Sequence, residues 1–267
     1  MFGEADENTE FNDTKESIEG LYHLDNENLD PKLFLFALQT YFNIVLKLLI
    51  SNFLTQAKSP VANFPTQMEY LEIADLFEGK NEESSVVANF FEIHYYEWFT
   101  FVDPSHKDSV TDVINTVLSQ LQEFDMGTFT VRPEFMQDVL QEVYMNLIPE
   151  KVRHLLGEYF SPDWIVEFLL DRIGYSYDKL GNTMIDKKVI DPTAGSGAFL
   201  LQALKRLINA YTDISKPYLS VKDIEKITSN IVGFDLNPIS SIAAKANYIL
   251  TVLSVAKVEE ITDPINI

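Results

Sequence analysis

Hydrophobic residues recur at the three-to-four-residue spacing of helices through most of the first 150 residues. This pattern predicts helices at residues 68–77, 86–98, 109–124 and 133–147. Phe, Tyr and Trp are dense at residues 90–101, where two interpretations stay open: the aromatic stripe of a helical core, which we favour, or a platform that stacks nucleic-acid bases. The stretch contains no Lys or Arg, although such a platform is normally accompanied by cations.

The most apolar segment, residues 33–57, is interrupted by polar side chains throughout its length. A membrane-spanning helix needs about 20 nearly uninterrupted apolar residues. We therefore expect a buried or amphipathic helix, and Asp30-Pro31 is typical of its start. The interrupting residues are Gln39, Asn43, Lys47, Ser51, Asn52 and Gln56.

From about residue 151 the pattern changes to short apolar runs that alternate with helical segments. A helix is expected to begin at Pro162 and to end at Leu170 or Ile173, before a turn-rich connection. The order of strand, glycine turn, helix, strand and helix that follows is that of a doubly wound α/β sheet. We expect buried strands at 188–191 and 231–235, helices at 199–211 and 239–254, and a connection with one short helix at 215–230.

The composition fits a globular protein. The chain has 267 residues, 46% of them hydrophobic, which is enough for one large or two modest domains. It has no cysteine, so a disulfide scaffold and a thiolate zinc site are excluded. No basic region followed by an apolar core marks a signal peptide. We expect a cytoplasmic location.

Charge divides the chain into two unlike regions. The net charge of −21 argues against a simple basic DNA-binding module, because such modules neutralise phosphates with Lys and Arg. Residues 1–150 hold 7 Lys and Arg against 27 Asp and Glu, whereas residues 151–267 hold 13 against 14. The predicted fold class is α/β, with an acidic flexible lead-in at 1–30, an all-helical domain at 31–150 and the first part of a Rossmann-like sheet at 151–267.

The strongest chemical signal is the segment Asp191-Pro-Thr-Ala-Gly-Ser-Gly-Ala-Phe199, which joins a predicted strand to a predicted helix. Gly195 and Gly197 let the backbone turn tightly and expose amides that a Cβ would shield. The pair alone also fits an ordinary turn. No Lys-Ser or Lys-Thr follows the glycines, so the segment is not a Walker-type phosphate loop.

Asp235 ends the second predicted strand and precedes Leu236-Asn237-Pro238. In dinucleotide-binding sheets an acid at this place accepts hydrogen bonds from a ribose and lies about 20 residues beyond the glycines. Here it lies 38 residues beyond Gly197, which disfavours a nicotinamide-dependent dehydrogenase. Taken alone, Asp235 is equally well explained as the N-cap of the next helix.

The third segment, Gly157-Glu-Tyr-Phe-Ser-Pro162, comes directly before a predicted helix. Ser161 fits the N-cap of that helix, with Pro162 at its first position. A glycine, aromatic residues and a cap together also fit the wall of a pocket. Both interpretations stay open on these residues alone.

The three segments occur in the order GEYFSP, VIDPTAGSGAFL and IVGFDLNPISSIAAKANYIL. This order resembles the front half of the adenine-N6 DNA methyltransferases of the gamma arrangement, especially those of type I and combined type II restriction-modification systems. The resemblance covers roughly residues 135–255. It implies binding of S-adenosylmethionine and transfer of its methyl group to the N6 of adenine in a specific DNA sequence.

The resemblance also implies roles for individual residues. Asp191 would hold the ammonium of the methionine moiety, Gly195 and Gly197 would let the cofactor approach the backbone, and Asp235 would accept the ribose hydroxyls. Thr193-Ala194 replace the family's commoner Ala-Cys, a mild departure that backbone contacts tolerate. Tyr159, Phe160 and Ser161 would line the methionine side, Asn237 and Pro238 would shape the adenine pocket, and Thr193, Ala194, Phe199 and Leu236 complete the implied cofactor site.

The family's catalytic motif, Asn/Asp-Pro-Pro-Tyr/Phe, orients a flipped-out adenine, and no such tetrapeptide occurs in this sequence. The sequence therefore implies no catalytic residue and no metal ligand. We expect a fragment that is inactive alone and shows weak or absent cofactor binding, and whose catalytic half and target-recognition domain lie beyond residue 267. Its expected partners are DNA, bound mostly by regions outside this fragment, and restriction or specificity subunits or domains. No contact with a membrane is expected.

Two other hypotheses stay open. Methyltransferases that act on protein or RNA share the later tetrapeptide, and the sequence downstream would separate them from DNA enzymes. The chain could also be a non-enzymatic interaction module, whose acidic half is a docking surface or a DNA mimic.

Overall fold

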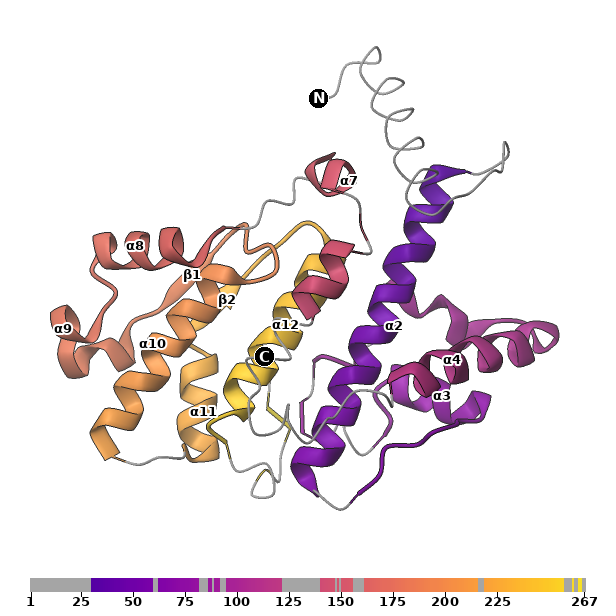
Figure 1. Cartoon of the computed structure of the whole chain (residues 1–267). Helices are drawn as coiled ribbons and strands as arrows, with labels where there is room; N and C mark the ends of the chain where they lie inside the picture. Colours follow the sequence, from indigo (N-terminus) through magenta and orange to yellow (C-terminus); the bar gives the residue numbers. More distant parts are fainter. Residues whose placement is uncertain are drawn as a thin grey trace, which may run out of the picture.

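The computed structural model describes residues 30–59, 62–81, 86–87, 89–91, 95–121, 140–146, 148, 150–155, 161–215, 219–256, 261 and 264–265. The N-terminal part, residues 30–155, contains α2 (Pro31–Lys58), α3 (Tyr70–Phe77), η2 (Tyr95–Phe101), η3 (Pro104–His106), α4 (Lys107–Leu121) and α7 (Glu150–Leu155). The C-terminal part, residues 161–265, contains α8 (Asp163–Ile173), α9 (Tyr177–Leu180), η4 (Gly181–Asp186), β1 (Val189–Asp191), α10 (Ala198–Ser215), α11 (Val221–Thr228), β2 (Ile231–Gly233) and α12 (Pro238–Leu253) (Figure 1).

Helix α2 is the long buried helix that the sequence predicts. Asp30 is its N-cap, because its carboxylate accepts a hydrogen bond from the backbone N–H of Lys32 at 2.9 Å. By length and composition α2 is also the one helix in the described ranges that could cross a membrane. In the fold it lies within protein, against α4, η2 and α12, and its Lys47 is fully buried.

The remaining N-terminal predictions have mixed outcomes. The helices expected at 68–77 and 109–124 are confirmed as α3 and α4, except that residues 122–124 lie outside the described residues. Residues 140–146 are helical, and the rest of the element expected at 133–147 contributes no described helix. The helix expected at 86–98 is wrong at its start, because Val87 forms a parallel bridge with Ile265 and helical structure begins only at Tyr95.

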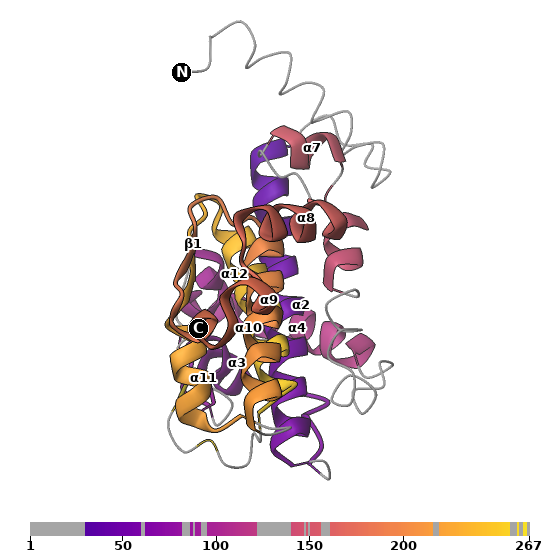
Figure 2. The ribbon, with the colours of Figure 1, turned by 90° about the vertical axis from the view of Figure 1, so that its left-hand side faces the viewer.

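In the C-terminal part, β1 and β2 pair in parallel, with Ile190 opposite Val232. Helices α10 and α11 make the connection between them, as the sequence predicts. Helix α10 contacts both strands, and Figure 2 shows the strands at the outer margin of this part. The expectation of buried strands is wrong for one face, since the side chains of Ile190 and Val232 are 67% and 42% exposed. The described helices cover only the opposite face, and a larger Rossmann-like sheet stays a prediction.

Helix α12 joins the two parts of the molecule. It lies between α10 and α2 (Figure 1) and contacts both. One of its faces packs into the core of the N-terminal part through Ile239, Ile242, Ala246, Ile249, Leu250 and Leu253. Another face places Tyr248 and Val252 in the core of the C-terminal part. The two cores are therefore continuous through this helix.

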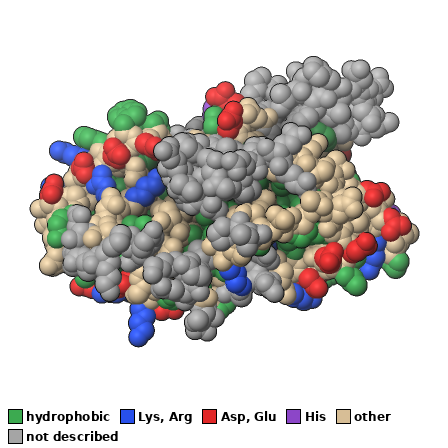
Figure 3. Space-filling model, turned by 60° about the horizontal axis from the view of Figure 1, so that its bottom comes forward, with side chains coloured by type: hydrophobic (Ala, Val, Ile, Leu, Met, Phe, Trp, Pro, Cys, Tyr) green, Lys and Arg blue, Asp and Glu red, His purple; other side chains and the backbone are tan. Residues whose placement is uncertain are grey.

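The charge asymmetry of the sequence is visible on the surface. Figure 3 shows carboxylates gathered at the end of the molecule that α3 and α4 form, and more Lys and Arg over the other end. A single ion pair, between Lys47 of α2 and Glu97 of η2, is fully buried among the described residues of the N-terminal part.

Candidate functional site

The glycine turn and the end of β2 are joined directly by hydrogen bonds. The backbone N–H of Gly195 donates to Oδ2 of Asp235 at 2.7 Å, across 40 residues of sequence. The N–H of Ala194 donates to the carbonyl of Phe234, and the N–H of Phe234 donates to the carbonyl of Asp191, both at 2.8 Å. Because parallel strands end at the same edge of a sheet, the motif residues that follow β1 and β2 meet there.

The two glycines of the turn have different surroundings. Both have positive φ angles, 55° at Gly195 and 93° at Gly197. A Cβ added to Gly195 would meet no atom within 4 Å, so its backbone faces open space. A Cβ added to Gly197 would lie 3.2 Å from the Cβ of Ala244 in α12. Gly195 therefore suits the approach of a ligand, whereas Gly197 suits the approach of a helix.

Gly233 is a structural residue that the sequence patterns did not single out. A Cβ at this position in β2 would lie 2.3 Å from Cδ1 of Leu200 and 3.0 Å from the Cβ of Ala194. A side chain at this position would therefore force Leu200, in the first turn of α10, to shift. The signal was present in the sequence, because a glycine inside a strand often marks a close approach.

Asp235 does not cap the next helix. Its two carboxylate oxygens accept from the backbone N–H groups of Gly195 and of Asn237, the latter at 2.8 Å. The N-cap of α12 is Asn237, whose side-chain oxygen accepts from the N–H of Ile239 at 3.1 Å. The alternative of Asp235 as N-cap is thus wrong. Each carboxylate oxygen has more than one acceptor site, so Asp235 retains capacity for a ligand hydroxyl.

The other predicted residues of the glycine segment vary in exposure. Asp191 is partly buried and accepts from the N–H of Thr193 at 3.1 Å, while Thr193 is exposed. Phe199 is partly buried and packs against the core of the C-terminal part. Leu236 is 99% exposed and does not line the cavity described below.

The segment before α8 is described only at its end. Tyr159 and Phe160 lie outside the described residues, and Ser161 is partly buried. Pro162, not Ser161, occupies the N-cap position, and no side chain caps the helix. The expected Ser161 cap is wrong, because Pro162 has extended backbone angles and the helix begins one residue later, at Asp163.

A cavity of about 530 Å³ runs along the free edge of β2. Its volume lies within the range of small-molecule sites. Ala194, Gly195 and Asp235 line it at the carboxyl end of the strand, and Lys245 and Tyr248 line it from α12. Burial raises the pKa of Tyr248 above its ordinary value, so the phenol stays neutral. Of the other predicted residues, Ser161, Asp191, Thr193, Gly197, Phe199 and Asn237 do not line this cavity.

In this region the glycine turn after β1 and the acid after β2 lie together at one edge of the pair of parallel strands. Residues 136–263 match the model of a known family, the N-6 DNA methylases. The resemblance inferred from the three ordered segments is thereby confirmed for residues 136–263, which are similar to the N-6 DNA methylases.

One curated relative agrees with this assignment. The chain is 26% identical over 131 residues to the adenine-specific methyltransferase PglX of Streptomyces coelicolor, an alignment that covers 46% of this chain. The chain spans about a tenth of the length of that relative. No solved structure matches the chain.

Proposed function

We propose that this chain is the cofactor-binding part of an S-adenosylmethionine-dependent methyltransferase that modifies the N6 of adenine in DNA. The observation that carries the proposal is the hydrogen bond between Gly195 and Asp235. It unites two of the three family segments at the carboxyl ends of adjacent parallel strands, inside the region that matches the N-6 DNA methylases.

The residues present fit such a cofactor. Open space around Gly195 allows close approach to the backbone, and the carboxylate of Asp235 lies on the wall of the cavity beside it. When bound, S-adenosylmethionine supplies an activated methyl group on its sulfonium. Within this chain, Asp235 would bind the ribose hydroxyls and Asp191 would bind the ammonium of the methionine tail.

Further contacts are proposed for the flanking residues. Tyr159, Phe160 and Ser161 would cover the methionine side, and Asn237 would lie near the adenine. Thr193, Ala194, Gly197, Phe199 and Leu236 would complete the surroundings of the cofactor. These assignments follow the family resemblance. The assignments of Gly195 and Asp235 are also supported by the cavity, because both residues line it.

The wider setting is also a proposal. The family points to a cytoplasmic restriction-modification system, with DNA and restriction or specificity subunits or domains as partners. The near-neutral charge of residues 151–267 suits an assembly in which other regions supply the basic surface that grips DNA.

Calorimetry with S-adenosylhomocysteine at high concentration of the 267-residue chain tests the proposal. We expect weak but measurable binding, which Asp235→Ala reduces by about tenfold or more because a charged hydrogen-bond acceptor is lost. Asp178→Ala is the matched control, since Asp178 is an exposed acid of α9, away from the cavity. Absence of binding by the unaltered chain would contradict the proposal and favour the non-enzymatic interaction module.

A further inference from the structure

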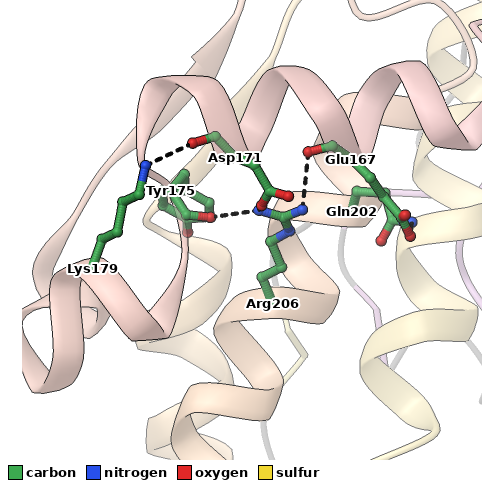
Figure 4. Close-up of polar contacts among 6 residues, drawn as sticks. All are labelled: Glu167, Asp171, Tyr175, Lys179, Gln202 and Arg206. Atoms are coloured by element: carbon green, nitrogen blue, oxygen red, sulfur yellow. Dashed lines mark hydrogen bonds and ion pairs between the residues drawn. The ribbon is translucent and has the colours of Figure 1, made fainter.

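A group of polar side chains ties α8 to α10, and none of its members lines the cavity (Figure 4). Arg206 lies near the middle of α10, and its side chain is only 19% exposed. Its guanidinium donates to Oδ1 of Asp171 at 2.7 Å, to the carbonyl of Tyr175 at 2.9 Å and to the carbonyl of Glu167 at 3.1 Å. One side chain thus holds two acceptors from the last two turns of α8 and a third from Tyr175, two residues beyond its end.

Two neighbouring contacts extend this attachment. Gln202, one turn earlier in α10, donates to Oε1 of Glu167 at 3.2 Å. Lys179 donates to the carbonyl of Asp171 at 3.2 Å. Cations placed near the last carbonyls of a helix interact favourably with its dipole, and the planar fork of arginine can reach several acceptors at once.

The two helices joined here begin at two parts of the proposed site. Helix α10 begins at Ala198, directly after the glycine turn, and Arg206 lies about 12 Å along it. Helix α8 begins at Asp163, directly after the segment that ends at Ser161 and Pro162. The contacts of Arg206 therefore limit how α8 can tilt or slide on α10, and with it where Ser161 lies relative to the glycine turn.

We propose that Arg206 is a positioning residue for cofactor binding. None of the hydrogen-bond partners described for Arg206 lines the cavity. It acts by fixing α8, and with it Ser161, against the helix that follows the glycine turn. This inference rests on the proposed function, because it assigns the fixed arrangement to binding of the cofactor's methionine side.

Hydrogen exchange of the 267-residue chain measures the positioning directly. The N–H groups of Ile165 and Val166 bond to the carbonyl of Pro162 and report on the first turn of α8. In Arg206→Gln we expect exchange at these two amides to rise by about tenfold, with α10 unchanged. Arg206→Lys keeps the charge but not the fork, and we expect an intermediate effect.

Lys226→Gln is the matched control for this experiment. It removes an ion pair of the same C-terminal part, between Lys226 of α11 and Asp186 of η4 at 3.0 Å, without touching α8. Equal exchange at Ile165 and Val166 in the two variants would overturn the inference. A uniform rise across α8 and α10 would also overturn it, because it would show a general loss of stability.

Binding of S-adenosylhomocysteine completes the test. We expect Arg206→Gln to weaken binding by about tenfold, since small displacements of binding groups are costly, and Lys226→Gln to leave it unchanged. Unaltered binding in Arg206→Gln, despite faster exchange in α8, would overturn the positioning role. If the unaltered chain binds no cofactor, the proposed function fails, while the exchange comparison still decides whether Arg206 holds α8.

Discussion

Gly197 and Ala244 approach so closely that a Cβ on the glycine would lie 3.2 Å from the Cβ of the alanine. The glycine turn is thus packed against α12 at Gly197 and open at Gly195, although the sequence pattern treats the two glycines alike. This difference separates the part of the turn that serves the fold from the part available to a ligand.

Alanine substitutions should distinguish the two glycines. We expect Gly195→Ala to lower the free energy of unfolding by about 1 kcal/mol, because φ is 55° and no atom opposes the new methyl group. Gly197→Ala should cost about 2–3 kcal/mol, because φ is 93° and the methyl group also presses on Ala244. Urea unfolding followed by circular dichroism measures both, and equal losses would contradict the assignment.

The sequence predicted the order of elements well, because local signals mark their ends. Asp30-Pro31 begins α2, and Asn237-Pro238 begins α12 as cap and first residue. The error at residues 86–91 has a long-range cause, since the partner of Val87 is Ile265, far along the chain. No local pattern encodes such a pairing. The exposure of Ile190 was equally hidden, because an apolar strand does not reveal which of its faces is covered.

The sequence named the candidate site residues but did not predict the contacts between them. The sequence named Gly195 and Asp235 as candidate site residues, and the structure joins them by a hydrogen bond at the ends of parallel strands, while their roles toward a ligand stay a prediction. That the carboxylate accepts the glycine N–H, and that a side chain at Gly233 would press on Leu200, depend on distances of a few ångströms between elements. Arg206 carries no motif, and only packing of α8 on α10 reveals it.

The buried ion pair of Lys47 and Glu97 gives a second prediction. The Nζ and Oε1 atoms are 2.5 Å apart, both side chains have no exposed area, and Asn43 donates to the same carboxylate oxygen at 2.9 Å. Lys47→Met or Glu97→Gln alone should lower the free energy of unfolding by about 3–5 kcal/mol, because each leaves an uncompensated buried charge.

The double variant provides the control for this pair. Lys47→Met with Glu97→Gln buries no charge and keeps an oxygen for Asn43, so we expect its loss to be smaller than the sum of the two single losses. Urea midpoints of all four proteins give the coupling energy. Simple additivity would show that the two charges do not interact.

The buried phenol of Tyr175 leads to a prediction about the stability of the fold at alkaline pH. Burial raises the pKa of its hydroxyl to about 12, against an ordinary value of 10, and the nearby Arg206 acts in the opposite sense. Below pH 10 the phenol is neutral in both folded and unfolded chains, so it adds no pH dependence. Between pH 10 and 12 the unfolded chain loses the proton first, and stability falls as pH rises.

Replacement by phenylalanine should remove this contribution. The Tyr175 hydroxyl is buried and has no hydrogen-bond partner among the residues that the structure describes, so Tyr175→Phe should differ from the unaltered chain by less than about 1 kcal/mol at pH 7. At pH 11 the variant should be the more stable protein. Tyr177→Phe is the control, because Tyr177 is 38% exposed, and an equal gain in both variants at pH 11 would refute the assignment to Tyr175.

Because α12 contributes residues to both hydrophobic cores, we expect the N-terminal and C-terminal parts to unfold together. Ile249 is fully buried in the N-terminal core, while Leu204 of α10 is fully buried in the C-terminal core. Either residue changed to alanine should cost about 2–5 kcal/mol. Because α12 contributes to both cores, each substitution should lower the stability of α2 and α10 by the same amount.

Native-state hydrogen exchange at increasing urea concentrations measures the opening free energy of each helix separately. If Ile249→Ala weakened α2 alone and Leu204→Ala weakened α10 alone, the parts would be independent, and the acidic helices would not be needed to hold the helix that follows Asp235.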